Sequence, residues 1–223
     1  MATIAVENYL KHALLLAERS PDGLVPMGKI ATALDVVPGT ATTMVKALAD
    51  SGLVLHEPRR GLRLTAAGHR VALNVLRKHR LVETFLVNVL KMDWSQVHAE
   101  AEQLEHAISD VVLGRLDALL GHPATDPHGD PIPSVEGTLS SAVYATLATC
   151  ATEVSLRVVR VTDQSADFLT FAEAHGLRPG AVAHVAERNL TAGLVTLRRP
   201  RGKPFALSLA AAGKIGVAPA EAG

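Results

Sequence analysis

The chain has 223 residues, of which 48% are hydrophobic and 20% are charged, and its 22 basic side chains balance 22 acidic ones. This composition predicts one large folded domain or two to three small ones, because a typical domain has roughly 100 to 200 residues. It excludes intrinsic disorder, collagen-like repeats and a disulfide-stapled miniprotein.

Neither a membrane span nor a secretion signal is visible in the sequence. No apolar run reaches the roughly 18 to 20 residues that a spanning helix needs, and no basic segment followed by a hydrophobic run opens the chain. The single cysteine, Cys150, cannot form an intramolecular disulfide. We therefore expect a soluble cytoplasmic protein without a membrane partner.

Charge is distributed unevenly along the chain. Residues 1–82 carry eleven basic and six acidic side chains, whereas residues 83–136 carry two basic and ten acidic ones. Residues 137–223 return to nine basic against six acidic side chains. A basic first segment can meet phosphates and an acidic middle segment can hold cations, although solvated helix faces would produce the same pattern.

The first third of the chain predicts a winged helix-turn-helix. Apolar spacing indicates helices over residues 6–17, 27–34 and 38–50, with Gly52 as the left-handed cap of the third. Two short extended pieces within residues 53–64 then flank a basic tip and predict a hairpin. This order of elements is typical of DNA-binding domains.

The middle third predicts two long helices and a fixed loop. Thr65 caps the first helix, which reaches about Leu90, and Asp93 with Gln96 forms a capping box for the second, which continues with a kink near Ser109 to Leu120. Four prolines and two glycines make residues 121–133 a loop, and small residues over 134–153 indicate a linker. From residue 154 onward, short strand-like runs predict a small β-barrel.

The second long helix of the middle third carries a stripe of metal-ligand side chains. His98, Glu102, Glu105 and His106 fall within about 100° of one another on a helical wheel. His79 and Glu83 repeat the spacing of four residues on the preceding helix. Because the stripe contains no basic residue, a divalent cation would supply the missing positive charge, although an acidic surface helix with ordinary histidines is the alternative.

The donor set indicates which metal to expect. Carboxylates and imidazoles without thiolates suit Mn²⁺ or Fe²⁺, whereas a structural zinc site would usually include cysteine. Co²⁺, Ni²⁺ or Zn²⁺ would also bind in vitro, because raw affinity follows the Irving–Williams order.

A second functional signal lies on the predicted winged helix. Small hydroxyl side chains on the third helix can approach base edges in a major groove, and arginines at the hairpin tip can lie against phosphates or a minor groove. A threonine-rich protein-binding helix is the alternative for this segment. The candidate DNA-binding residues are Lys29, Pro38, Thr40, Thr42, Thr43, Lys46, Arg59 and Arg60.

Five motifs of residues 3–137 resemble the metalloregulator family of the diphtheria toxin repressor and the manganese transport regulator. They are VENYLKHALLLAE, PGTATTMVKALADSGLV, RKHRLVETFL, VHAEAEQLEHAISD and GHPATDPHGDPIP, and they occur in family order. Residues from 154 to about 216 resemble, more loosely, the SH3-like barrel of many members.

The resemblance implies a mainly α-helical, homodimeric, metal-activated repressor that binds palindromic operator DNA and controls genes of metal-ion homeostasis. The implied domains are a winged helix-turn-helix DNA-binding domain (1–64), a helical metal-binding and dimerisation domain (65–137), a linker (138–153) and a small SH3-like, FeoA-like β-barrel (154–223). Neither an enzymatic activity nor a small organic substrate is expected.

The resemblance also implies two metal sites. The primary site would use Glu102, Glu105 and His106 with Asn8 from the first helix, and the ancillary site would use His79, Glu83 and His98. Two residues of the primary site depart from the family pattern. Asn8 replaces the usual Met or Asp, and Lys11 replaces a ligating carboxylate of the manganese regulator. Glu7 would then serve as a substitute ligand. Gln164 and Asp167 are the candidates that the barrel would add to the ancillary site.

Other histidines and the tryptophan receive structural interpretations. His122 and His128, in the proline-rich loop, are expected to be hydrogen-bonding loop residues and not metal ligands. Trp94 is expected to anchor the core or the dimer interface. Two other functions stay open: a helical dinuclear-metal enzyme and a metal-independent winged-helix regulator.

Overall fold

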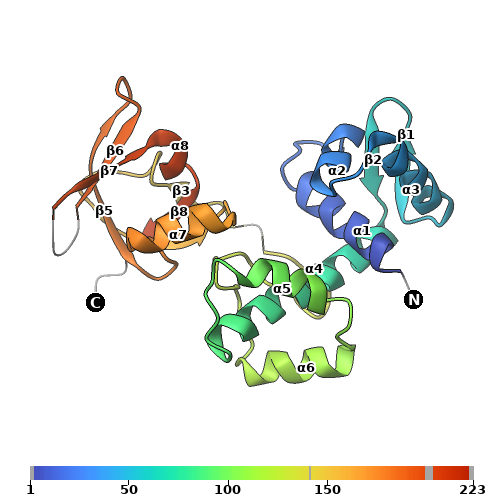
Figure 1. Ribbon diagram of the computed structural model, residues 1–223. Coiled ribbons are helices and arrows are strands. Elements are labelled where there is room, and N and C mark those ends of the chain that lie inside the picture. Colours follow the sequence, from blue (N-terminus) through green and yellow to red (C-terminus); the bar gives the residue numbers. More distant parts are fainter. Residues whose placement is uncertain (1–2, 141, 199–202, 221–223) are drawn as a thin grey trace. The chain divides into compact units, whose positions relative to one another are not determined.

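The computed structural model describes residues 3–140, 142–198 and 203–220 and is a mixture of helices and strands (Figure 1). The helices are α1 (Ile4–Ala17), α2 (Met27–Ala33), α3 (Pro38–Asp50), α4 (Ala66–Asn88), α5 (Val97–Leu104), α6 (Asp110–Leu119), α7 (Ala166–Ala174) and α8 (Leu209–Ala212). The strands are β1 (Val54–Glu57), β2 (Gly61–Leu64), β3 (Ala145–Thr146), β4 (Ser155–Val161), β5 (Val182–Asn189), β6 (Leu194–Arg198), β7 (Phe205–Ser208) and β8 (Ile215–Pro219). Within the described ranges, every helix is too short or too polar to cross a bilayer.

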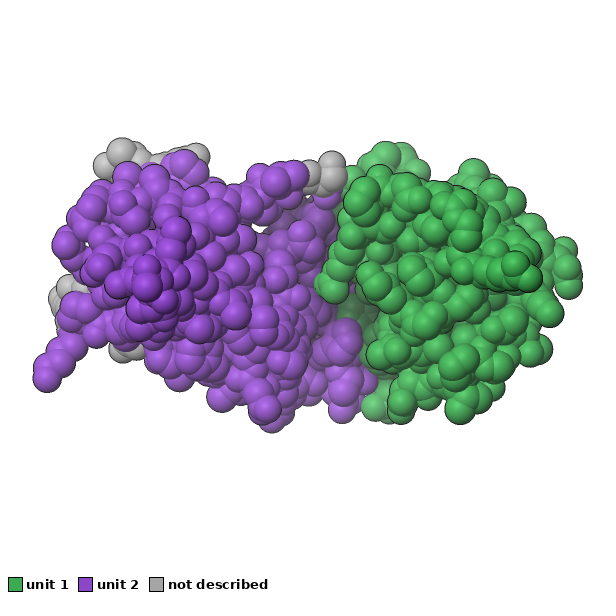
Figure 2. Space-filling view, turned by 90° about the horizontal axis from the view of Figure 1, so that it is seen from above, with its two compact units in different colours: residues 1–79, 102–115, 132–139 green, residues 80–101, 116–131, 140–223 purple. Residues whose placement is uncertain are grey.

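The chain forms two compact units, coloured separately in Figure 2. Unit 1 comprises residues 1–79, 102–115 and 132–139, and unit 2 comprises residues 80–101, 116–131 and 140–223. The boundaries of these units pass through α4, α5 and α6. The domain limits expected from the sequence stay a prediction.

Unit 1 contains the predicted winged helix-turn-helix elements, α1 to β2. The Schellman motif expected after α3 is present: Gly52 has φ +71°, and the N–H of Leu53 donates to the carbonyl of Leu48 at 2.9 Å. Strands β1 and β2 pair antiparallel, and Leu62 of β2 also pairs with Val25. Gly61 permits this close approach, because a Cβ there would lie 2.0 Å from the carbonyl oxygen of Val25.

Capping explains where the helices of the middle segment begin and corrects one expectation. Thr65 caps α4 as predicted, accepting a hydrogen bond from the N–H of Gly68 at 3.1 Å. The single kinked helix expected from Asp93 to Leu120 is wrong. The Asp93 side chain accepts from the N–H of Ser95 in a turn, so α5 begins only at Val97, and it ends at Leu104. Ser109 then caps α6 by accepting from the N–H of Val112.

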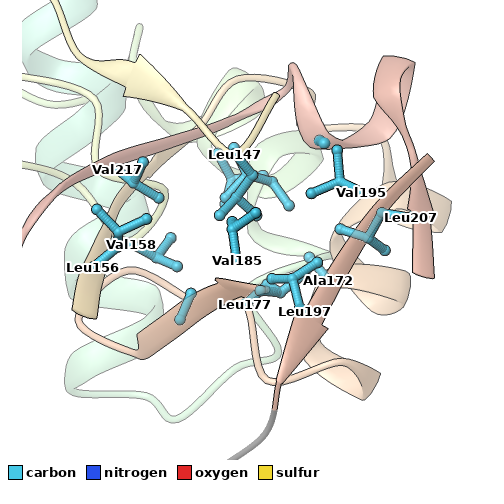
Figure 3. Close-up of a cluster of buried hydrophobic side chains, with 14 of the residues drawn as sticks. Leu147, Leu156, Val158, Ala172, Leu177, Val185, Val195, Leu197, Leu207 and Val217 are labelled. Atoms are coloured by element: carbon cyan, nitrogen blue, oxygen red, sulfur yellow. The ribbon is translucent and has the colours of Figure 1, made fainter. Parts of the chain in front are cut away.

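Unit 2 contains an antiparallel sheet with the strand order β3-β8-β4-β5-β6-β7. Alternating side chains of these strands pack with α7 around one buried cluster, which Figure 3 shows. It includes Leu156, Val158, Val185, Leu197 and Val217. Among the described residues β3 and β7 do not pair, so the sheet is open and not the closed barrel that the sequence suggested.

Part of the stretch expected to be a linker, residues 138–153, is folded. It contributes β3, which pairs with β8, and the buried side chains of Leu147 and Cys150. The small residues of this stretch hid these two core positions, because they give no regular hydrophobic period.

Candidate metal centres and DNA-binding surface

Glu105 is the centre of a buried cluster of charged groups in unit 1. It lies in the turn that directly follows α5, and its side chain is fully buried. Its Oε2 lies 2.6 Å from Nδ1 of His79, on α4, and its Oε1 accepts from Nζ of Lys11, on α1, at 2.7 Å. Three segments distant in the sequence therefore meet at one carboxylate.

Lys11 and Glu102 complete this side of the cluster. Lys11 Nζ also donates to Glu102 Oε1 at 2.6 Å, and the lysine is only 1% exposed. One ligand atom from each of His79, Glu102 and Glu105 can be chosen so that the three lie within 4.8 Å of one another. These donors are compact enough for one cation, and the ammonium group of Lys11 already supplies a positive charge to both carboxylates.

His106 connects the same turn to α1. Its Nδ1 lies 2.6 Å from Glu7 Oε2, and its Nε2 lies 2.8 Å from Asn8 Oδ1 and 3.2 Å from Glu105 Oε1. Both ring nitrogens therefore face oxygen atoms of possible ligands. The residues predicted for the primary site, Glu7, Asn8, Glu102, Glu105 and His106, are brought together in unit 1.

A second cluster lies in unit 2, around Glu83 of α4. Glu83 is fully buried; its Oε1 lies 3.2 Å from Nδ1 of His98, on α5, and its Oε2 lies 3.8 Å from Nδ1 of His128. Glu83, Asp126 and His128 can place one ligand atom each within 4.8 Å of one another, and all three residues are buried. The sequence interpretation missed Asp126 and treated His128 as a hydrogen-bonding loop residue.

The local sequence Asp-Pro-His-Gly-Asp explains how the loop presents these groups. Asp126 Oδ1 accepts from the backbone N–H groups of His128 and Asp130 at 2.8 and 2.9 Å, which folds the loop around its own carboxylate. Gly129 supplies the left-handed conformation, with φ +86°. His128 Nε2 lies 2.9 Å from the carbonyl oxygen of Trp94, which orients the other ring nitrogen, Nδ1, toward Glu83.

The electrostatics of this loop suit a cation. Burial, reinforced by the negative charges of Asp130 and Glu83, raises the pKa of Asp126 well above its usual range, although Arg80 acts in the opposite direction. Among the described residues, neither Asp126 Oδ2 nor His128 Nδ1 has a hydrogen-bond partner. Because buried polar atoms nearly always have a partner, these atoms fit the donor set of a divalent ion.

The remaining candidate ligands have other contacts. Gln164 Nε2 donates to Asp130 Oδ2 at 2.7 Å, and Asp130 also pairs with Arg160, so Gln164 holds the loop against the segment after β4. Asp167 is exposed in the first turn of α7. His122 is exposed and lies 2.8 Å from Asp117, and His128 has the hydrogen bond to Trp94 described above. Coordination of a metal by Gln164 or Asp167 stays a prediction.

The predicted DNA-binding side chains are accessible. Lys29, Pro38, Thr40, Thr43, Lys46, Arg59 and Arg60 are exposed, and Thr42 is half-buried. The hydroxyl groups of Thr42 and Thr43 donate to backbone carbonyls one turn earlier, which fixes both rotamers on α3. At the tip of the hairpin, Arg60 pairs with Glu57 at 2.6 Å, and Arg59 adopts φ +66°. Trp94, by contrast, is fully buried in the core of unit 2, as expected for a core anchor.

Three family models match successive parts of the chain. Residues 1–62 match the N-terminal DNA-binding domain of iron-dependent repressors, residues 65–134 match their metal-binding and dimerisation domain, and residues 145–219 match the FeoA domain.

Named relatives agree with these models. The iron-dependent repressor IdeR of Mycobacterium tuberculosis is 39% identical over 130 residues, which are 58% of this chain and 55% of the relative, so the alignment spans about half the length of that protein. The diphtheria toxin repressor of Corynebacterium diphtheriae is 34% identical over 160 residues, 70% of each chain.

Solved structures extend the similarity to almost the whole chain. A manganese-dependent transcriptional repressor in complex with manganese is 34% identical and has a TM-score of 0.85, with 96% of this chain and all of the other covered. The manganese regulator SloR is 33% identical, with a TM-score of 0.76 and coverage of 96% and 98%. This chain combines a winged helix, carboxylate and imidazole clusters and a FeoA-like sheet. It therefore belongs to the family of iron- and manganese-dependent transcriptional repressors.

Proposed function

We propose that the protein is a cytoplasmic repressor that binds operator DNA as a homodimer when Mn²⁺ or Fe²⁺ is bound. The observation that carries this proposal is the pair of carboxylate and imidazole clusters on a chain that also carries an accessible winged helix. The family consists of transcriptional repressors and not of enzymes, so a helical metalloenzyme is not favoured. A metal-independent regulator would not explain why the carboxylate and imidazole groups of Glu83, Asp126 and His128 are buried together in unit 2.

Two sets of residues would hold the metal. In unit 1 these are Glu102, Glu105 and His106, with His79 and with Glu7 or Asn8 from α1. In unit 2 they are Glu83, Asp126 and His128, with His98 beside Glu83. The bound ion would supply positive charge that offsets the repulsion between the carboxylates.

The unit 1 residues suggest how metal binding would affect DNA binding. Helix α1 belongs to the winged-helix segment, and its Glu7 and Asn8 contact His106 of the turn after α5. Ligands from both segments on one ion would fix the position of α1 relative to this turn. In a homodimer, such positions set the separation of the two α3 helices, which must match half-sites about 34 Å apart or a multiple of that distance. Metal binding would then shift the population toward the DNA-competent arrangement.

A DNA-retardation experiment tests this function. Duplexes would be selected from a random pool in Mn²⁺ and then retarded in parallel with Mn²⁺, Fe²⁺ or a chelator. We expect retardation of a palindromic sequence in either metal and only weak, salt-sensitive binding in chelator. Glu105→Gln and His106→Ala should remove the metal response. Equally tight binding after exhaustive chelation would refute the proposal.

A further inference from the structure

Lys11 places a buried ammonium group at the point where the unit 1 carboxylates converge. Its side chain is 2% exposed, and Nζ contacts Glu102 Oε1 at 2.6 Å and Glu105 Oε1 at 2.7 Å. Lysine is almost never fully buried without such partners. The two carboxylates therefore have a cation that is covalently attached to α1.

The same two carboxylates belong to the compact donor set of unit 1. A divalent ion would hold carboxylate oxygens at about 2.0 to 2.2 Å, closer than the ammonium group holds them. An ion that used Glu102 and Glu105 would compete with Lys11 for their Oε1 atoms, and its charge would repel the ammonium group at short range. The present contacts of Lys11 therefore oppose binding of the metal.

We propose that Lys11 is a tethered cation that takes the place of the metal in the metal-free protein and must be displaced when the metal binds. This inference rests on the proposed metal-dependent function. Because Lys11, Glu7 and Asn8 all lie on α1, the lysine keeps α1 attached to the turn after α5 while no metal is bound. Displacing it raises the metal concentration at which the unit 1 site fills, so Lys11 sets the threshold of the response.

Neutral variants of Lys11 test this role. Lys11→Met keeps an unbranched side chain only one atom shorter, and Lys11→Gln keeps a hydrogen-bond donor should the methionine variant not fold. The control is Lys78→Met, which removes a lysine of the same unit whose Nζ lies 3.7 Å from Asp110. Mn²⁺ affinity would be measured by competition with a fluorescent chelator, and thermal unfolding would be followed in chelator. A His128→Asn background removes the contribution of the unit 2 cluster.

We expect both Lys11 variants to bind Mn²⁺ at least about tenfold more tightly than the unsubstituted protein, because a repelling charge is gone. They should also unfold at a lower temperature in chelator, since the buried carboxylate of Glu105 and the half-buried carboxylate of Glu102 lose their counter-ion. Lys78→Met should leave the affinity unchanged. A lower unfolding temperature with an affinity within about twofold of the unsubstituted protein would overturn the proposal, because it would make Lys11 a structural ion pair only.

The outcomes also separate this proposal from the function on which it rests. Metal-dependent retardation of DNA together with unchanged affinity in the Lys11 variants would refute the role of Lys11 and leave the repressor function standing. Metal binding by the Lys11 variants but not by the unsubstituted protein would support the displacement of Lys11 and refute metal activation through unit 1. Absence of binding in all proteins would overturn both.

Discussion

Gly129 offers a test of how the loop that carries Asp126 and His128 is held in unit 2. A Cβ at this position would lie 1.9 Å from the carbonyl oxygen of Val159 and 2.8 Å from Cα of Arg160, both of them backbone atoms of β4. Neither can rotate away. In Gly129→Ala the loop must move off β4, which breaks the 2.8 Å hydrogen bond from the N–H of Val161 to the carbonyl of His128.

The magnitude follows from three effects. A non-glycine residue in the left-handed region costs roughly 1 to 2 kcal/mol, and overpacking costs roughly 1 to 3 kcal/mol. The broken hydrogen bond contributes about 1 kcal/mol. We expect Gly129→Ala to lower the free energy of unfolding of unit 2 by about 3 to 6 kcal/mol, which at about 2 to 4 °C per kcal/mol lowers Tm by roughly 6 to 24 °C.

Trp94 provides the assay. It is the only tryptophan of the chain, it is fully buried, and its ring stacks on that of His128 with centroids 5.4 Å apart. Its fluorescence therefore reports unfolding of unit 2. Gly121→Ala is the matched control, because Gly121 also has a positive φ, +74°, but an added Cβ would meet no atom within 4 Å. If the two variants differ by less than about 1 kcal/mol, the packing of this loop on β4 is refuted.

Three further experiments address the charges and the proposed surfaces. The pKa of Asp126 is raised in the folded protein, so the folded protein binds the proton of this carboxyl group more tightly than the unfolded chain does. In chelator, protonated Asp126 therefore contributes most to stability below the ordinary pKa of 3.8. This contribution is lost as the pH rises through the raised pKa of the folded state. Asp126→Asn should flatten this fall in thermal melts across a pH series; an unchanged slope would contradict the assignment. Replacing Arg59 and Arg60 with alanine should weaken binding to all DNA sequences. It should also reduce the slope of log K against log salt concentration by about 0.9 for each phosphate that the protein no longer neutralises. An unchanged slope would show that the hairpin does not contact DNA. Mn²⁺ bound at the unit 2 cluster should quench the fluorescence of Trp94, because the ring of His128, a proposed ligand, stacks on the indole ring. His128→Asn should abolish the quenching. Equal quenching in both proteins would show that the ion binds elsewhere.

The proposed ligand set was only partly visible in the sequence. Spacing on a helical wheel grouped Glu102, Glu105 and His106, and these residues do lie together, although Glu105 and His106 are in a turn and not on α5. The assignment of His79 to an ancillary site with Glu83 and His98 stays a prediction; Nδ1 of His79 also contacts Glu105. Asp126 had only the short acid and histidine spacing of its loop as a signal, which is too common to indicate a metal by itself.

Features that depend on neighbours in the chain were determined by the sequence alone. Thr65 caps α4 and Gly52 ends α3 where expected, because caps and turns involve residues only a few positions apart. Tertiary structure decided which distant charges meet. Lys11 and Glu105 are separated by 94 positions, and no periodicity relates them. Burial then strengthens their contact, because a buried carboxylate such as that of Glu105 requires a counter-ion, supplied either by a lysine of the chain or by a metal.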